Sequence, residues 1–208
     1  MVQTIQAKAV TLHDLDNLFG LQLLEDQQFF PEWQENLPEL TAEEKRRLDR
    51  VKDSFNNLLE YPPLLENTVK MIVLSPLLDL AEVYLKPFHI KSEPSFEIST
   101  EDKGTLIKGN VDVLVLFEKL WVLVIEAKRA AVDIDEGRAQ LLSYMLASPT
   151  PNLPVFGMMT NGRNFLFVKL IRQPIPQYAT SRLFSLVNPG NELYTVLSIL
   201  KRLVQLVQ

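Results

Sequence analysis

Apolar residues recur along the chain with two spacings, and the spacing predicts where helices and strands lie. Over residues 11–30 they lie three or four positions apart, which predicts a helix with Thr11 at its N-cap. The sequence Thr41-Ala42-Glu43-Glu44 matches a capping box, so a second helix is expected over about 42–60. The remaining helices are expected from Leu64 to about Tyr84, with a kink or interruption at Pro76, over 135–147 and over about 191–207.

Runs of β-branched and aromatic residues bounded by turn residues predict the strands. Asn161-Gly162 is a strong turn signal between two such runs. The order of helices and strands suggests an α/β fold with a mixed β-sheet flanked by helices. The expected strands cover about 95–99, 109–117, 121–128, 155–160, 165–170 and 182–187.

The clearest predicted hairpin joins two apolar runs, residues 109–117 and 121–128, through the three-residue link 118–120. A link of this length places Phe117 opposite Trp121. Counting outward from that pair, an acid at the far end of each run faces the other across the hairpin. A two-residue turn would shift the register by one, and the two acids would then point to opposite faces of the sheet.

The two acids are Asp112 and Glu126, and Lys128 lies two residues further on the same face of its strand. Directly opposed residues have Cβ atoms roughly 5 Å apart, so two like charges there repel. Two carboxylates and one amine on one face indicate a divalent-metal site with a catalytic cation beside it. The alternative is an ordinary hairpin whose charged ends reach solvent.

Composition limits the kind of metal that such a site would hold. The chain of 208 residues is 47% hydrophobic, contains no cysteine and has two histidines, His13 and His89. A disulfide framework is therefore excluded, and a zinc site of the common His- or Cys-rich kind is disfavoured. Carboxylates suit a hard ion, so Mg²⁺ or Mn²⁺ is the expected cofactor.

Charge and leader sequences bear on partners and location. The net charge of −5 disfavours a nonspecific nucleic-acid coat protein, although it does not exclude an enzyme whose metal neutralises an acidic centre. The N-terminus lacks a basic-then-apolar leader, and no apolar run approaches membrane-spanning length. A cytoplasmic protein that does not enter a membrane is expected.

The spacing of Asp112 and Glu126-Ala127-Lys128 resembles the PD-(D/E)xK nuclease superfamily, although Asn110-Val111-Asp112 lacks the proline of the motif's name. The resemblance implies that Asp112 and Glu126 bind Mg²⁺, with the Ala127 carbonyl as a further ligand. It also implies that Lys128 positions or helps to deprotonate the attacking water and steadies charge on the scissile phosphate.

Three further segments extend this resemblance to the N-terminal nuclease domains of type I restriction motor subunits. Gln140 and Tyr144 lie four residues apart on one helix face and look like the Q-xxx-Y motif, which implies that Gln140 belongs to the active site and Tyr144 supports it. Glu66, on the helix ahead of the sheet, resembles an acid that approaches the metal; an exposed glutamate at a helix start is the alternative. The turn at Asn161-Gly162 resembles the segment that closes the sheet, and both residues are interpreted as structural.

The expected organisation is an N-terminal helical extension, residues 1–62, followed by a nuclease-like domain, residues 63–208. The expected function is Mg²⁺-dependent hydrolysis of DNA phosphodiester bonds, within a restriction system. DNA is the expected partner, together with a separately encoded motor or specificity subunit or a second copy in a homodimer. The alternative is a catalytically inactive nuclease fold kept as a binding or scaffolding module.

Overall fold

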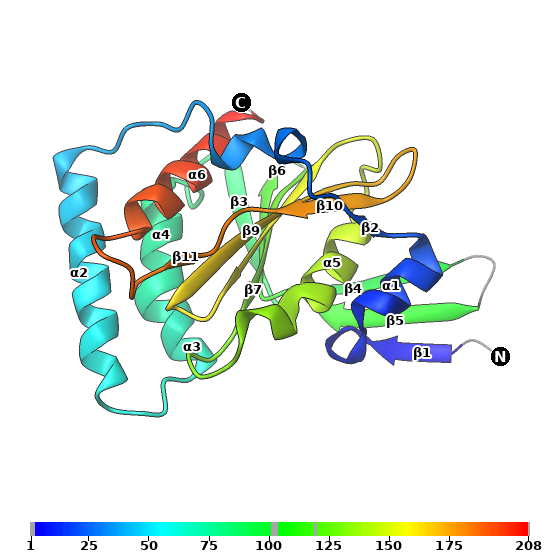
Figure 1. The fold of residues 1–208 in the computed structure, drawn as a ribbon, viewed down its shortest axis with the longest axis horizontal. Helices are drawn as coiled ribbons and strands as arrows, with labels where there is room; N and C mark the ends of the chain where they lie inside the picture. The colour runs from blue at the N-terminus through cyan, green and yellow to red at the C-terminus, as the bar shows by residue number, and fades with distance from the viewer. Residues whose placement is uncertain (1–2, 101–103, 119, 208) are drawn as a thin grey trace.

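The computed structural model describes residues 3–100, 104–118 and 120–207, which form two β-sheets and two layers of helices (Figure 1). The larger sheet has the strand order β2-β10-β9-β8-β7-β6-β3, and β11 pairs with β9 as an eighth strand among the described residues. β7 and β8 run parallel, and so do β2 and β10, whereas the other neighbours are antiparallel. The fold is therefore α/β with a mixed sheet flanked by helices, as the sequence predicted.

The strands of the larger sheet include the predicted hairpin and the pair around Asn161. Their bounds are β2 Gln22–Leu23, β3 Phe88–Ser92, β6 Val113–Phe117, β7 Leu120–Ala127, β8 Val155–Thr160, β9 Asn164–Ile171, β10 Gln177–Thr180 and β11 Phe184–Ser185. The smaller sheet has the order β1-β5-β4, with bounds β1 Gln3–Gln6, β4 Ser95–Thr100 and β5 Thr105–Asn110.

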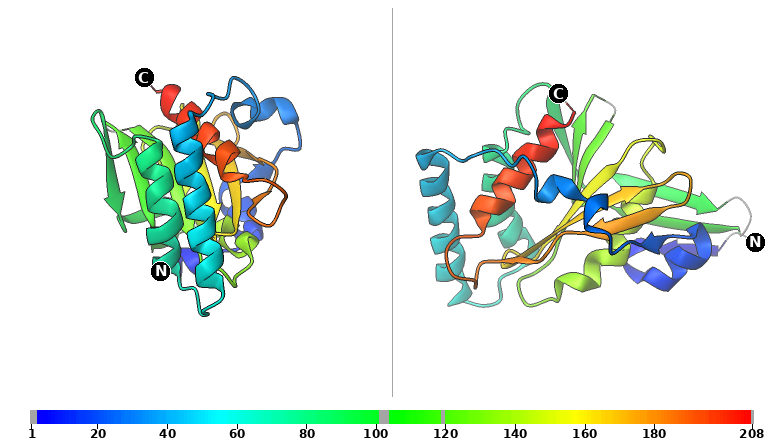
Figure 2. Two further views of the ribbon diagram at one scale, coloured as in Figure 1. Left: turned by 90° about the vertical axis from the view of Figure 1, so that its left-hand side faces the viewer. Right: turned by 45° about the horizontal axis from the view of Figure 1, so that its top comes forward.

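Helices cover both faces of the larger sheet, because its strands alternate apolar side chains toward each face. On β7, Leu123 and Ile125 join the core under α2 (Ala42–Leu59), α4 (Ser75–Leu80) and α6 (Leu193–Gln205). Figure 2 shows these helices side by side in front of the sheet. Val124 joins the opposite core, which α1 (Leu12–Phe19), α5 (Arg138–Leu146) and the smaller sheet complete.

Several helices follow the local signals closely. The capping box at Thr41 is formed, since its Oγ1 accepts the Glu44 N–H and the Glu44 carboxylate accepts the Thr41 N–H. Thr11 caps α1 in the same way, but that helix ends at Phe19 and Gly20 adopts φ +67°, so the predicted helix to residue 30 is wrong. Three short 3₁₀ segments lie at Ala7–Ala9, Gln27–Phe29 and Pro31–Trp33, and a fourth, Ile134–Gly137, leads into α5.

The helix predicted from Leu64 to Tyr84 is interrupted before Pro76 and ends at Leu80. It consists of α3 (Glu66–Val69), a π-helical segment Lys70–Leu74 and α4. Pro76 has no N–H and its ring crowds the carbonyl four residues earlier, which is the reason to expect a break there. The wider π turn, closed by the Ser75 N–H on the Lys70 carbonyl, accommodates the proline without ending the helix.

The predicted single run 109–117 is divided between the two sheets. β5 ends at Asn110 in the smaller sheet, and β6 begins at Val113 in the larger one. Asp112 lies in the bend between them. The loss of strand pairing at this point lets the chain change sheets, which periodicity alone does not reveal.

The predicted turn geometry of the hairpin is also wrong, yet its outer register is correct. Phe117 pairs with Leu120 rather than with Trp121, and Lys119 of the link lies outside the described residues. A bulge then shifts the register, so that Val115 pairs with Leu123 and Val113 with Ile125. The next residues outward are Asp112 and Glu126, so the two acids lie opposite each other as predicted.

Residues before 62 contribute strands as well as helices. β1 lies parallel to β5, and β2 lies parallel to β10, so this part of the chain joins both sheets. The division at residue 62 stays a prediction. None of the helices formed by the described residues is long and apolar enough to cross a membrane.

Candidate metal centre

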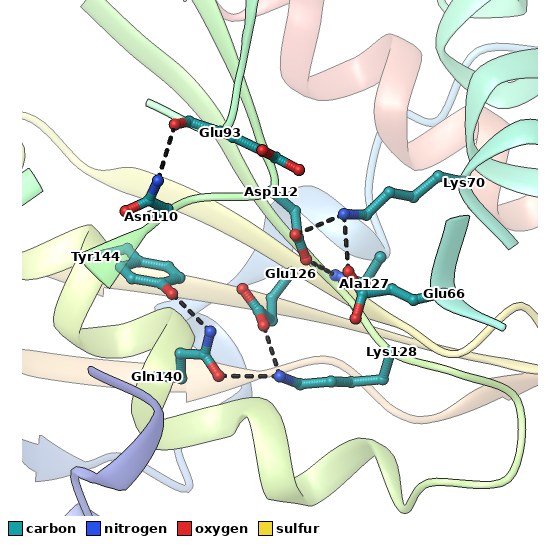
Figure 3. A network of polar contacts seen from close by, with 10 residues as sticks. All are labelled: Glu66, Lys70, Glu93, Asn110, Asp112, Glu126, Ala127, Lys128, Gln140 and Tyr144. Atoms are coloured by element: carbon teal, nitrogen blue, oxygen red, sulfur yellow. Dashed lines mark hydrogen bonds and ion pairs between the residues drawn. The ribbon is translucent and has the colours of Figure 1, made fainter. Parts of the chain in front are cut away.

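Asp112 and Glu126 converge at the end of the β6–β7 hairpin, between α3 on one side and α5 on the other (Figure 3). Their side chains are 14% and 3% exposed, so both carboxylates are largely removed from water. The alternation of side chains along a strand explains why they converge. Leu114 is two residues from Asp112, Val124 is two residues from Glu126, and both face the same core, so the two acids lie on that face as well. The hairpin therefore brings two carboxyl groups together in a place where repulsion between their charged forms is poorly screened.

Each oxygen of Asp112 has a hydrogen-bond donor. Oδ2 accepts the backbone N–H of Ala127 at 2.7 Å, and Oδ1 accepts the Lys70 ammonium at 2.6 Å. Burial raises the pKa of Asp112 above its ordinary value, although Lys70 and the Ala127 N–H act in the opposite direction. Asp112 is thus held in one orientation by the neighbouring strand and by the π-helical segment.

Glu126 is partnered on one side only. Its Oε1 accepts the Lys128 ammonium at 2.6 Å, whereas its buried Oε2 has no hydrogen-bond partner among the described residues. Burial, reinforced by the charge of Asp112, raises the pKa of Glu126 to about 8 despite Lys128. A buried carboxylate oxygen without a partner is costly, and a bound cation is one way of satisfying it.

Lys128, Gln140 and Tyr144 form a chain of hydrogen bonds that leads away from Glu126. Lys128 Nζ donates to Gln140 Oε1 at 2.9 Å, and Gln140 Nε2 donates to the Tyr144 hydroxyl at 2.5 Å. Burial raises the pKa of the Tyr144 phenol, which keeps it protonated. The predicted pair on α5 therefore does meet the predicted lysine, which directly follows β7.

The smaller sheet packs against Tyr144. The Phe96 ring of β4 lies edge-on to the Tyr144 ring, with centroids 4.5 Å apart. A Cβ at Gly109 on β5 would approach Phe96 to 2.8 Å and Tyr144 to 3.2 Å, so glycine is needed for this contact. The supporting role of β4 and β5 is not visible in the motif spacing.

Glu66 and Lys70 bring the helix ahead of the sheet to the same place. Glu66 Oε1 lies 2.8 Å from Lys70 Nζ, and the Glu66 side chain is 42% exposed. Lys70 carries no predicted role, although its position four residues after Glu66 is the spacing of a helical ion pair. The structure thus brings together all six predicted side chains and adds Lys70.

Two clefts flank these residues. One of about 440 Å³ is lined by Leu65, Glu66, Asn67, Lys128, Arg129, Val132 and Glu136. The other, of about 250 Å³, includes Asn67, Lys70, Tyr84, Ile90 and Asp112 among its lining residues. Asn67 lines both; Asp112 lines the smaller cleft, and Lys128 lines the larger one.

The donor set fits a single divalent cation rather than a cage of side chains. Within the described part of the chain, no three His, Asp or Glu side chains lie together in an arrangement that holds a metal ion. The expected ligands are two carboxylates and the Ala127 carbonyl, and such an oxygen set suits Mg²⁺ with water completing its shell. The unpartnered Glu126 Oε2 agrees with that set.

Asn161 and Gly162 have structural contacts. Asn161 Oδ1 accepts the N–H groups of Arg163 and Asn164, and its Nδ2 donates to the Val132 carbonyl. Gly162 adopts φ +82°, a conformation that favours glycine. These contacts shape the turn between β8 and β9 and hold the loop that follows Lys128.

Comparisons with known proteins identify no family. No protein-family profile and no curated protein matches the chain. A cryoEM structure of a DrdV–DNA complex is similar over 76% of this chain, with 11% identity and a TM-score of 0.49, and the chain spans 14% of the length of that protein. The crystal structure of SSO0001 is similar over 84% of this chain and 82% of its own, with 19% identity and a TM-score of 0.26.

Proposed function

We propose that this protein is a metal-dependent nuclease of the PD-(D/E)xK type that hydrolyses phosphodiester bonds of DNA in the cytoplasm, as part of a restriction system. One observation carries the proposal. Asp112 and Glu126 converge from a hairpin, Lys128 contacts Glu126, and a buried Glu126 oxygen has no partner in the described part of the chain. Two buried acids side by side, one with an unpartnered oxygen, are an arrangement that a bound cation would stabilise.

Asp112, Glu126 and the Ala127 carbonyl would hold Mg²⁺, or Mn²⁺ in its place. Bound there, the ion lowers the pKa of water and offsets the charge that develops on a phosphate. The raised pKa of Glu126 supports this assignment, because a nearby cation favours the charged form of a buried carboxylate.

Lys128 would hold its proton on Nζ, orient water and steady negative charge on the scissile phosphate. Gln140 would position Lys128 through its Oε1, and Tyr144 would hold Gln140 through its hydroxyl. Lys128 also lines the larger cleft, so a substrate that enters there would come next to its side chain.

The substrate would approach through the two clefts beside Asn67. Lys128 and Arg129 line one of them, but Glu66 and Glu136 line it too, and the net charge of −5 further limits affinity for DNA. We therefore include a separately encoded motor or specificity subunit, or a second copy of the chain, as the source of additional DNA contacts.

The test is cleavage of plasmid and single-stranded DNA in Mg²⁺, Mn²⁺ or EDTA. The wild type is expected to cut with either metal and to be inactive in EDTA, with Asp112→Asn and Lys128→Ala at least 100-fold slower. The matched control is Lys108→Ala, which breaks the exposed ion pair between Lys108 on β5 and Glu97 on β4 and should cut normally. Cleavage that persists in EDTA or survives both site substitutions would rule out the proposal.

A binding or scaffolding module without catalysis is the second candidate, and a specific observation favours it. Both acids already have lysine partners, since Lys70 contacts Asp112 and Lys128 contacts Glu126. A network of ion pairs of this kind can serve structure alone. DNA binding without cleavage, unchanged by Mg²⁺ and by Asp112→Asn, would support this candidate.

A further inference from the structure

Lys70 occupies the space between two acids that approach the centre from different elements. Its Nζ lies 2.6 Å from Asp112 Oδ1 and 2.8 Å from Glu66 Oε1, and its side chain is only 18% exposed. Figure 3 shows the ammonium between the two carboxylates, on the side of Asp112 away from Lys128. The position is therefore filled by a cation that belongs to the chain itself.

The backbone fixes this position. Lys70 is the first residue of the π-helical segment, and its carbonyl accepts the Ser75 N–H that closes the wide turn. Val69, directly before Lys70, and Val73, three residues after it, are fully buried, which anchors the segment against the core. Single π turns within helices are frequent at functional sites. The ammonium is thus carried by a segment that is packed against the core.

The Lys70 ammonium contacts the Asp112 oxygen that a divalent cation could take without disturbing the backbone. Both Asp112 oxygens already have a donor, which is the backbone N–H of Ala127 for Oδ2 and the Lys70 ammonium for Oδ1. At Oδ1 a metal would displace only a side chain. A monovalent and a divalent cation a few ångströms apart in a partly buried site repel each other strongly. The two therefore compete for Asp112.

We propose that Lys70 is a built-in counter-cation that holds Asp112 and Glu66 in the metal-free protein and that a divalent ion displaces. This inference rests on the proposed metal site. Lys70 thereby weakens metal binding while it stabilises the empty centre. Lys128 has a different place, because it contacts Glu126 and Gln140 and leaves Asp112 untouched.

The test is calorimetric titration of Mn²⁺ into the protein without DNA. Lys70→Met removes the charge but keeps the length of the side chain, and we expect it to bind Mn²⁺ at least about tenfold more tightly than the wild type. Lys70→Arg keeps the charge and should bind as weakly as the wild type. In EDTA, Lys70→Met should unfold at lower temperature, since the two acids lose their shared cation.

Matched variants separate failure of this inference from failure of the metal site. Lys108→Met, which breaks an exposed pair with Glu97, should bind Mn²⁺ like the wild type, and Asp112→Asn should abolish binding. Binding that depends on Asp112 but is unchanged or weaker in Lys70→Met would overturn the counter-cation role alone. Binding absent from both the wild type and Lys70→Met would overturn the metal site and the inference together.

If Lys70→Met does not fold, Lys70→Gln provides the same comparison, because its side chain is polar and can donate hydrogen bonds but carries no positive charge. Tighter Mn²⁺ binding is expected there as well. Equal or weaker binding by folded Lys70→Gln would contradict the proposal.

Discussion

The backbone N–H of Ala127 donates to Asp112 Oδ2 across the hairpin, at 2.7 Å. Ala127 is the middle residue of the Glu126-Ala127-Lys128 segment, so the strand that carries one acid also fixes the orientation of the other. Because of this bond, the relative position of the two acids depends on the backbone of the hairpin as well as on their own side-chain conformations.

The bond predicts different costs for two substitutions of Asp112. Ala127 is fully buried, so Asp112→Ala leaves its N–H without an acceptor and should lower the free energy of unfolding by about 1–3 kcal/mol. Asp112→Asn retains a carbonyl oxygen and should lower it less. Urea unfolding in EDTA measures both. Equal stability of the two variants would show that the bond is unimportant.

The raised pKa of Glu126 predicts how the stability of the metal-free protein depends on pH. An acid whose pKa is higher in the folded state binds its proton more tightly there, so stability falls as pH rises from about 4.5 to about 8. Glu126→Gln cannot titrate and should reduce this fall by an amount on the order of 2–4 kcal/mol. Urea unfolding in EDTA between pH 5 and pH 8.5 gives the difference. Parallel curves for the wild type and Glu126→Gln would contradict the assignment.

Gln140 is predicted to act by holding Lys128. Gln140→Ala removes the acceptor of the Lys128 ammonium and the donor to Tyr144, and cleavage should slow by about 10- to 100-fold because the ammonium is no longer oriented. Tyr144→Phe removes one hydroxyl and keeps the contact with Phe96, so its effect should be smaller. The rates are compared in Mg²⁺ at saturating DNA. A larger loss of cleavage rate in Tyr144→Phe than in Gln140→Ala would contradict the proposal that Gln140 is the residue that orients Lys128.

Gly137 provides a test of the space around Lys128. A Cβ at this position would lie 3.3 Å from Lys128 Cε and 3.5 Å from Glu126 Cγ, while the backbone itself is helical and tolerates alanine. Gly137→Ala should therefore change the free energy of unfolding by less than about 1 kcal/mol but slow cleavage severalfold. The two quantities are measured on the same preparation. An unchanged rate would mean that Lys128 has room to move without consequence.

Capping residues and turn residues predict the helix starts and turns that are stabilised by residues close in sequence. The capping box at Thr41 fixes the start of α2, and Asn161-Gly162 fixes the turn between β8 and β9. The sequence does not predict the strands β1, β2, β3 and β10, nor the first four residues of β5, because such strands are stabilised by pairing partners far away in the chain. Pairing of this kind leaves little trace in the periodicity of a single segment.

The site could be predicted in part because its spacing follows the hairpin. The register of β6 and β7 brings Asp112 opposite Glu126, Lys128 lies two residues after Glu126, and Gln140 and Tyr144 lie one helical turn apart. The register was correct for a reason that the sequence does not display. The link between Phe117 and Leu120 is one residue shorter than expected, and the bulge on β7 compensates for it. Lys70 was missed because its partner Asp112 is distant in sequence.

The central claim is that Asp112 and Glu126 share one divalent cation. Anomalous scattering from a crystal soaked in Mn²⁺ tests it most directly, with Asp112→Asn as the control. We expect a single strong peak within about 2.0–2.4 Å of a carboxylate oxygen of each acid, with the Lys70 ammonium displaced from Asp112, and no peak in the variant. A soaked wild-type crystal without a peak between these acids, in which Lys70 still contacts Asp112, would contradict the account.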